Sequence, residues 1–166
     1  IAKVRDVVEA DPRRRYVVTS APGRRGPDDH KITDLLYLCH EHARQGLPFE
    51  EVFVLIAERF NEIISGLGID LELDEQLEQV KTRIAKVARQ GQSADYAASR
   101  GECLTGQILA RLLNYSFFDP SELIFFAERG RINEAKTYGS ISARLGSTPR
   151  AVIPGFYGSA PDGRIQ

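Results

Sequence analysis

The residues between Tyr16 and Tyr37 have the types and the spacing that suit the binding of an anion. An apolar run, Tyr16 to Thr19, is followed by Ser20-Ala-Pro-Gly23 and, after a polar loop, by Thr33 at the expected start of a helix. Proline cannot continue a sheet ladder and glycine permits a sharp turn, so the run predicts a buried strand that ends there. A strand that leads into a small-residue loop and a helix amino terminus directs backbone N–H groups and the helix dipole at one crevice. We therefore expect chemistry to gather at this strand end.

The same pattern returns near the end of the sequence. Val152-Ile-Pro-Gly155 reads as a short strand that stops at Pro-Gly, and Gly155 and Gly158 bracket two aromatic residues. Glycines in this arrangement suit a backbone that approaches a ligand closely.

Three polar clusters carry weaker signals. Gly23-Arg-Arg-Gly26 lacks the Gly-x-x-x-x-Gly-Lys-Ser/Thr spacing of a Walker phosphate loop. Asp28-Asp-His30 lies in a polar loop, where adjacent side chains seldom converge on one metal ion, and Arg13-Arg-Arg15 is most simply a solvated turn. We predict no metal site.

The remaining sequence supplies the elements that must position these strand ends. Apolar residues three or four positions apart predict helices over residues 1–10, 33–44, 48–66, 74–90, 93–115 and 135–145. Strands are predicted over 16–19, 122–127 and 151–154. Four helices between two strand regions indicate an α/β fold in which a helical insertion is stacked on a sheet.

Composition is that of a soluble globular domain of 166 residues, with 42% hydrophobic and 27% charged residues. Its 22 basic and 23 acidic residues produce no field that would attract nucleic acid or a membrane surface. The apolar runs are far shorter than the roughly 20 residues that span a bilayer, and no signal peptide is visible. We expect a cytoplasmic location, with Cys39 and Cys103 reduced and buried.

Three segments, in their order and at their separations, resemble the amino-acid-kinase domain of the aspartate kinases. They are Ser20-Ala-Pro-Gly with Ile32-Thr-Asp34, then Ser99-Arg-Gly-Glu102, and then Val152-Ile-Pro-Gly-Phe-Tyr-Gly158 with Asp162-Gly-Arg164. The resemblance covers essentially the whole chain. It implies a partial three-layer α/β/α fold of the carbamate-kinase-like type over residues 1–166, with a helical insertion at about 46–92.

The resemblance implies that Ser20, Thr33, Glu102 and Phe156 bind the substrate, L-aspartate. Thr33 would contact aspartate at a helix start, Glu102 would hold its α-amino group, and Phe156 would line the pocket beside the strand end at Ser20. The chemistry agrees, because a hydroxyl at a helix start donates to a carboxylate and a glutamate forms a charge-assisted pair with an ammonium. Taken singly, each residue has a plainer interpretation: Thr33 as an N-cap, Glu102 as a solvated helix residue and Phe156 as a core side chain.

The resemblance also implies groups that this sequence does not contain. The family's Lys-Phe-Gly-Gly-Thr-Ser loop, its Arg-Gly-Gly-Ser-Asp loop, its nucleotide-binding half and its regulatory ACT domains have no match here. We therefore expect a fragment cut from a longer protein, with no catalytic residue of its own. Because phosphoryl transfer depends on positioning and charge neutralisation by such groups, we expect the fragment to be inactive. ATP and Mg²⁺ are then cofactors of the parent enzyme, and none is expected on the fragment.

These expectations describe the aspartate-binding side of an ATP-dependent aspartate kinase, which makes 4-phospho-L-aspartate at the entry to lysine, threonine and methionine synthesis. Its partners would be L-aspartate and ATP, with a homo-oligomer compatible and neither nucleic acid nor a membrane expected. One alternative is a glutamate or uridylate kinase of the same superfamily. Another is a helical interaction module that dimerises through open sheet edges. The long insertion and the Ser-Arg-Gly-Glu motif favour aspartate kinase.

Overall fold

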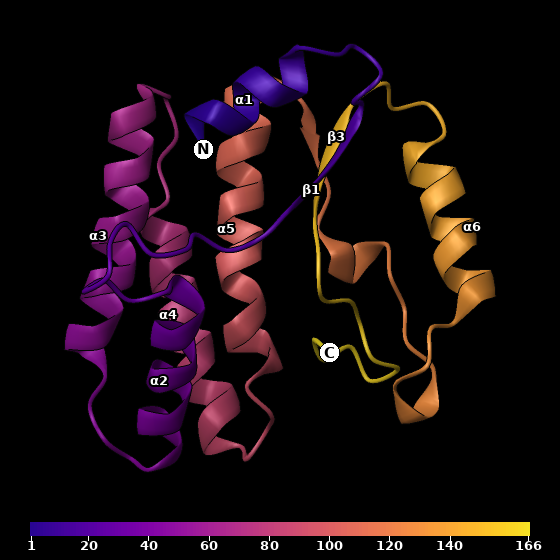
Figure 1. The fold of residues 1–166 in the computed structure, drawn as a ribbon. Coiled ribbons are helices and arrows are strands. Elements are labelled where there is room, and N and C mark those ends of the chain that lie inside the picture. The colour runs from indigo at the N-terminus through magenta and orange to yellow at the C-terminus, as the bar shows by residue number, and fades with distance from the viewer. The chain divides into compact units, whose positions relative to one another are not determined.

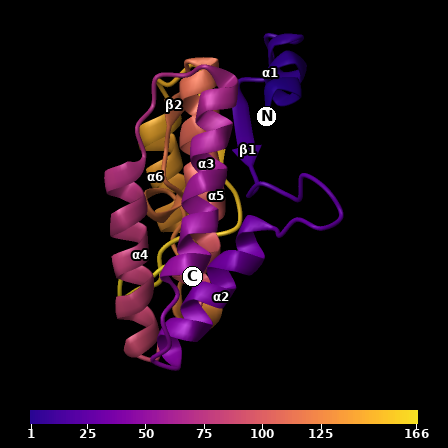
Figure 2. The same ribbon diagram turned by 90° about the vertical axis from the view of Figure 1, so that its left-hand side faces the viewer.

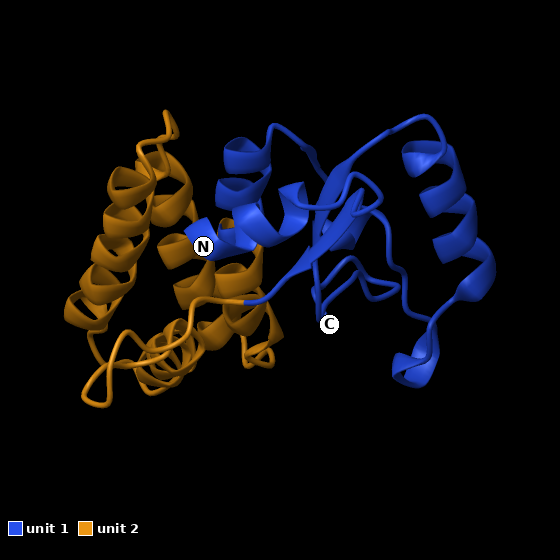
Figure 3. Cartoon of the chain, turned by 45° about the horizontal axis from the view of Figure 1, so that its top comes forward, with its two compact units in different colours: residues 1–20, 105–166 blue, residues 21–104 orange.

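The chain divides into two units, which the computed structural model describes over residues 1–166 (Figure 3). The first unit comprises Ile1–Ser20 and Thr105–Gln166, and the second comprises Ala21–Leu104. Helix α5 (Asp95–Leu113) contributes residues to both units.

The first unit is built on a small parallel sheet with the strand order β1-β3-β2. β1 (Tyr16–Thr19) pairs with the central strand β3 (Ala151–Pro154), and β2 (Ser116–Phe117) pairs with the other edge of β3. Parallel neighbours cannot be joined by a tight turn, so long crossover connections separate these strands in the sequence.

Helices cover both faces of β3, because successive side chains of a strand point to opposite faces. Val152 packs with buried residues of α1 (Ala2–Glu9) and α5, whereas Ala151 packs with Leu145 of α6 (Glu134–Leu145). Figure 1 shows α6 on the opposite side of β3 from α1 and α5. The predicted α/β/α layering is therefore confirmed in this unit.

The strand predicted over Glu122–Ala127 is wrong. The 3-10 turn η1 (Pro120–Glu122) occupies its start, where the Asp119 carboxylate caps the turn. The Thr137 hydroxyl of α6 accepts a hydrogen bond from the Phe125 N–H at 3.0 Å and donates one to the Phe125 carbonyl at 3.3 Å. These backbone groups have partners without a sheet ladder, so this segment makes only isolated bridges. A second 3-10 turn, η2, follows at Glu128–Gly130.

The strand that completes the sheet is β2, which the sequence pattern did not reveal. The predicted helix over 93–115 ends earlier, at Leu113, because Asn114 adopts a left-handed φ of 54°. Asparagine tolerates this conformation and commonly stops a helix. A strand of two residues is too short to show an alternation of apolar and polar side chains.

The second unit is helical. It contains α2 (Ile32–Arg44), α3 (Glu50–Leu67), α4 (Asp74–Arg89) and the first part of α5. α2 packs against both α3 and α4 (Figure 2). The residues with no exposed surface in this unit are Ile32, Leu36, Cys39, Ile56, Phe60, Ile84, Ala97, Ala98, Ser99 and Leu104.

The helices of the second unit agree with the sequence pattern to within a few residues, and both cysteines are buried as expected. The segment 46–92 lies within this unit, and its role as an insertion stays a prediction. None of the helices combines the length and apolar character that crossing a membrane requires.

Gly106 allows α5 to pack closely on the sheet of the first unit, and this gives a test of the fold. A Cβ at Gly106 would lie 2.7 Å from Pro154 Cγ and 3.1 Å from Phe117 Cε2, whereas a Cβ at Gly139 of α6 would meet nothing within 4 Å. We expect Gly106→Ala to lower the free energy of unfolding by about 1 to 3 kcal/mol through overpacking. Gly139→Ala should raise it by roughly 0.5 to 1 kcal/mol, since alanine is the better helix former.

Urea denaturation of the two variants measures both effects. Equal stabilisation by the two alanines would contradict the close approach of α5 to β2 and β3.

Candidate functional site

Ser20 and Phe156 follow neighbouring strands of the first unit at the same edge of the sheet. Thr19 and Pro154 are register partners, and the Gly155 N–H donates a hydrogen bond to the Thr19 carbonyl at 3.1 Å. The carboxyl ends of parallel strands share an edge, so this pairing brings Ser20 beside the turn that carries Phe156. Both side chains are exposed, and 71% of Phe156 is accessible to solvent. The core role considered for Phe156 is therefore wrong.

The backbone of Phe156 is strained. Its φ of 86° lies in the left-handed region that residues with a side chain rarely adopt. Such a conformation costs about 1 to 3 kcal/mol and is found disproportionately at ligand-binding positions. The exposed ring makes little contact that could offset this cost.

The two glycines that flank this turn are required for packing within the fold. A Cβ at Gly158 would lie 2.5 Å from the Ile124 carbonyl oxygen, and one at Gly155 would lie 3.0 Å from Val18 Cγ1. The contact at Gly158 is with backbone, which cannot move aside easily. Packing is therefore a sufficient reason for both glycines, and the close approach of a ligand to this turn stays a prediction.

Thr33 lies in the first turn of α2, in the second unit. The N-cap of α2 is Lys31, and no side chain caps this helix, so the interpretation of Thr33 as an N-cap is wrong. The Thr33 side chain is half-buried. The Ile32 N–H donates to the Pro22 carbonyl at 3.4 Å, which holds the start of α2 against the residues that follow β1 in sequence.

Glu102 is a half-buried acid on α5 rather than a solvated surface residue. Burial raises the pKa of its carboxyl group above the ordinary value of 4.5. Hydrogen bonds from backbone N–H groups, including that of Ala21, and the positive charge of Arg100 act in the opposite direction. The backbone after β1 therefore donates directly to this carboxylate.

Close packing at Gly101 brings Glu102 and the start of α2 into one region of the second unit. A Cβ at Gly101 would lie 2.7 Å from Ala21 Cβ, 3.4 Å from Ile32 Cγ2 and 3.5 Å from Leu36 Cδ1. Gly101, which precedes Glu102, therefore packs closely against Ile32, which precedes Thr33. This region combines a carboxylate suited to an ammonium group with a helix amino terminus suited to an anion.

The predicted site residues thus fall into two groups. Ser20 and Phe156 follow paired strands of the first unit, whereas Thr33 and Glu102 lie on α2 and α5 of the second, next to Ile32 and Gly101, which pack closely. The peptide bond between Ser20 and Ala21 links the two groups in sequence.

Comparison with known proteins gives consistent results, although no family model matches the chain. Aspartokinase 3 of Bacillus subtilis is 24% identical over 173 residues, which is 98% of this chain and 38% of that protein. The crystal structure of Clostridium acetobutylicum aspartate kinase is 48% identical, with a TM-score of 0.91 over 99% of this chain and 37% of that one. The chain is homologous over nearly its whole length to part of the aspartate kinases.

Two structures of Escherichia coli aspartokinase III share the fold at 21% identity. The complex with lysine and aspartate has a TM-score of 0.73, and the complex with aspartate and ADP has one of 0.64. The chain spans less than two fifths of the length of these relatives. The likeness does not favour a glutamate kinase, a uridylate kinase or an interaction module.

Arg59 is a buried, charged residue that the sequence analysis did not single out. It lies on α3 with only 4% of its surface exposed, and it donates to the Gly23 carbonyl at 3.0 Å and to the Asp29 carboxylate. Asp29, considered above as one of three loop residues that could suggest a metal ion, is instead held by arginines. The signal was present, since Arg59 shares a helix face with Ile56, Phe60 and Ile63.

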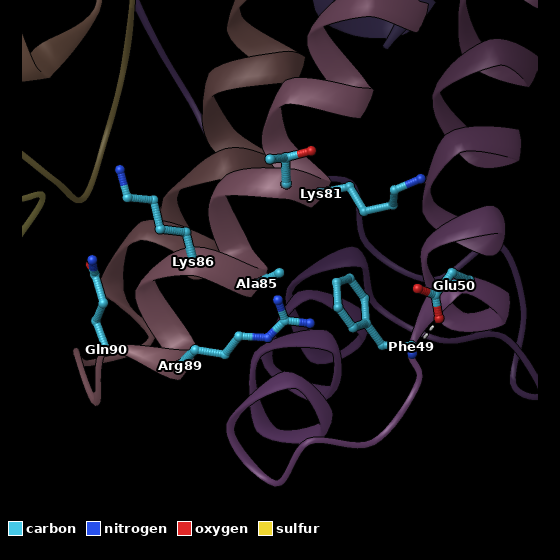
Figure 4. Close-up of a pocket in the computed structure, with 8 residues that line it drawn as sticks. Phe49, Glu50, Lys81, Ala85, Lys86, Arg89 and Gln90 are labelled. Atoms are coloured by element: carbon cyan, nitrogen blue, oxygen red, sulfur yellow. Dashed lines mark hydrogen bonds between the residues drawn. The ribbon is translucent and has the colours of Figure 1, made fainter.

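A cavity of about 510 Å³ in the second unit lies away from these residues (Figure 4). Lys81, Lys86 and Arg89 project from α4 around it. Its lining residues are Phe49, Glu50, Lys81, Thr82, Ala85, Lys86, Arg89 and Gln90. None of the predicted substrate-binding residues is among them. Two of the basic residues lie in the last turn of α4, where positive charge stabilises the helix dipole.

The strain at Phe156 predicts an unusual order of stability for two variants. Phe156→Gly should have a free energy of unfolding about 1 kcal/mol higher than Phe156→Ala, because only glycine adopts the left-handed conformation without steric cost. Both variants lack the aromatic ring, so the comparison isolates the cost of the left-handed backbone conformation. Chemical denaturation that found the alanine variant as stable as the glycine variant would contradict the strain.

The pKa of Glu102 predicts a pH-dependent difference in stability. Because the folded state raises this pKa, the wild type loses stability relative to Glu102→Gln as the pH rises through the ordinary value of 4.5 toward the folded-state value. The stability of Glu102→Gln relative to wild type should therefore be greater near pH 7 than at about pH 3.5. Urea unfolding at both pH values measures this, with Glu58→Gln on the exposed face of α3 as the control. A difference that did not change with pH would contradict the effect of burial.

Proposed function

We propose that this chain is the part of an aspartate kinase that holds the acceptor, L-aspartate. The observation that carries the proposal is the region around Gly101, where the Glu102 carboxylate, the Ala21 N–H and the first turn of α2 lie together. Glu102 holds the α-ammonium group of aspartate, and the hydroxyl of Thr33 donates to one of its carboxylates. Ser20 and Phe156 remain proposed aspartate-binding residues on the resemblance to the family.

In the whole enzyme, an oxygen of the aspartate side-chain carboxylate attacks the γ-phosphorus of ATP. A new O–P bond forms, the bond to the β-phosphate oxygen breaks, and ADP leaves. ATP and Mg²⁺ supply the phosphoryl group and neutralise its charge. The residues of this chain act earlier, since they bind and orient the acceptor. The product is 4-phospho-L-aspartate, and the cytoplasm, which holds both proposed substrates, is the proposed location.

The charges of this region support aspartate over an uncharged acceptor. Aspartate carries one ammonium and two carboxylates, and this region offers one half-buried carboxylate with a nearby helix amino terminus. A desolvated charge interacts more strongly with an opposite charge than a solvated one does. Two aspartate kinase structures that share the fold are complexes with aspartate itself.

A thermal-shift titration with L-aspartate tests the proposal, with D-aspartate and L-glutamate as controls. A ligand that binds only the folded state adds about 2.7 kcal/mol of stability at a hundredfold excess over its dissociation constant. We expect a rise in the unfolding midpoint that is selective for L-aspartate, is lost in Glu102→Gln and is weakened in Thr33→Val.

The matched control is Glu58→Gln, which removes an exposed carboxylate from α3 and should leave the shift unchanged. A shift of equal size in Glu102→Gln, or none in the wild type, would contradict the assignment of these residues to an aspartate site.

A further inference from the structure

A guanidinium group is buried within the helical unit. Arg59 has 4% of its surface exposed and lies on the face of α3 that also carries Ile56 and Phe60, neither of which has exposed surface. An unpaired charge in such a place is strongly destabilising. The guanidinium group of Arg59 therefore requires hydrogen-bond acceptors at fixed positions around it.

Both partners of Arg59 come from one loop, which joins Ala21 to α2. Its Nη1 donates to the Gly23 carbonyl at 3.0 Å, near the start of the loop, and its Nη2 donates to Asp29 Oδ2 near the end. These two acceptors are six residues apart in sequence. One planar group thus fixes the loop at two points.

Asp29 is itself oriented for this contact. The Arg25 backbone N–H donates to Asp29 Oδ2 at 2.7 Å, and the Arg25 side chain pairs with the same carboxylate. These interactions, together with Arg59, hold the pKa of the Asp29 carboxyl group well below its ordinary value. Arg25 also pairs with Glu62, one turn beyond Arg59 on α3. The loop is therefore attached to α3 by a connected network of charges.

The two ends of this loop carry the groups assigned to aspartate. At one end the Ala21 N–H donates to the Glu102 carboxylate. At the other end Ile32 begins α2, and its N–H donates to the Pro22 carbonyl. A change in the loop at Gly23 or Asp29 therefore alters both the backbone donor beside Glu102 and the place of Thr33.

We propose that Arg59 is a positioning residue for the acceptor amino acid, acting through its bonds to Gly23 and Asp29. This inference rests on the proposed function. Arginine is required because its fork of donors reaches a carbonyl and a carboxylate at once, which the single ammonium of lysine does not reproduce. Arg59 does not itself contact aspartate. It sets the geometry of the loop that does.

The test separates positioning from mere stability by comparing Arg59→Lys with Ile56→Val. Both changes affect buried residues of α3, but only the first alters the attachment of the loop. Calorimetric titration with L-aspartate measures the dissociation constant, and hydrogen exchange of the amides over residues 21–33 measures loop order. A second variant, Arg59→Met, replaces the guanidinium group with an unbranched apolar side chain.

We expect Arg59→Lys and Arg59→Met to weaken L-aspartate binding at least tenfold and to raise exchange over residues 21–33 at least tenfold. Ile56→Val should keep the dissociation constant within about twofold of wild type while lowering the unfolding midpoint, as loss of a buried methyl group does. Unchanged affinity in both Arg59 variants, or an equal loss in Ile56→Val, would overturn the role of Arg59. Wild-type protein that bound no aspartate would instead overturn the proposed function on which this role rests.

Discussion

Two glycines in α5 allow this helix to approach its neighbours at distances that no side chain permits. Gly101 faces Ala21 and the start of α2 in the second unit, and Gly106 faces Pro154 and Phe117 in the first. The first contact joins α5 to the loop after β1 and to the start of α2, and the second joins it to the last residues of β2 and β3. The placement of Glu102 beside the backbone of Ala21 depends on the first of them. A close helix contact, rather than a long-range charge, is thus what assembles this region.

The loop after β1 compensates buried charges of both signs. It presents a backbone N–H to the Glu102 carboxylate and a backbone carbonyl to the Arg59 guanidinium. Main-chain groups are reliable partners for this purpose, because they are fixed once the loop is fixed and carry no rotamer entropy of their own. Asp29 adds the one full counter-charge, which the charge network with Arg25 keeps ionised. The loop is therefore bonded both to Glu102 of the proposed site and to the buried Arg59 of the helical unit.

The turn after β3 shows how strain and packing divide between neighbouring residues. Gly155 and Gly158 make contacts that exclude a side chain, whereas Phe156 keeps its side chain in a backbone conformation that disfavours one. The flanking contacts hold the turn in shape, so the cost at Phe156 is imposed by the fold around it. An exposed aromatic ring maintained in this way is more readily understood as a binding element than as a stabilising one.

The sequence by itself determined the helices of both units, the strands β1 and β3 and the segments that resemble the aspartate kinases. Each of these is predicted by a local sequence pattern, either the spacing of apolar residues or a motif such as Ser-Arg-Gly-Glu. Only the tertiary structure decided that residues 122–127 form no sheet strand, that Phe117 lies in one, and that Arg59 pairs with Asp29. The physical reason is that these features depend on partners distant in sequence. Thr137 satisfies Phe125 across 12 residues, and Arg59 reaches Asp29 across 30.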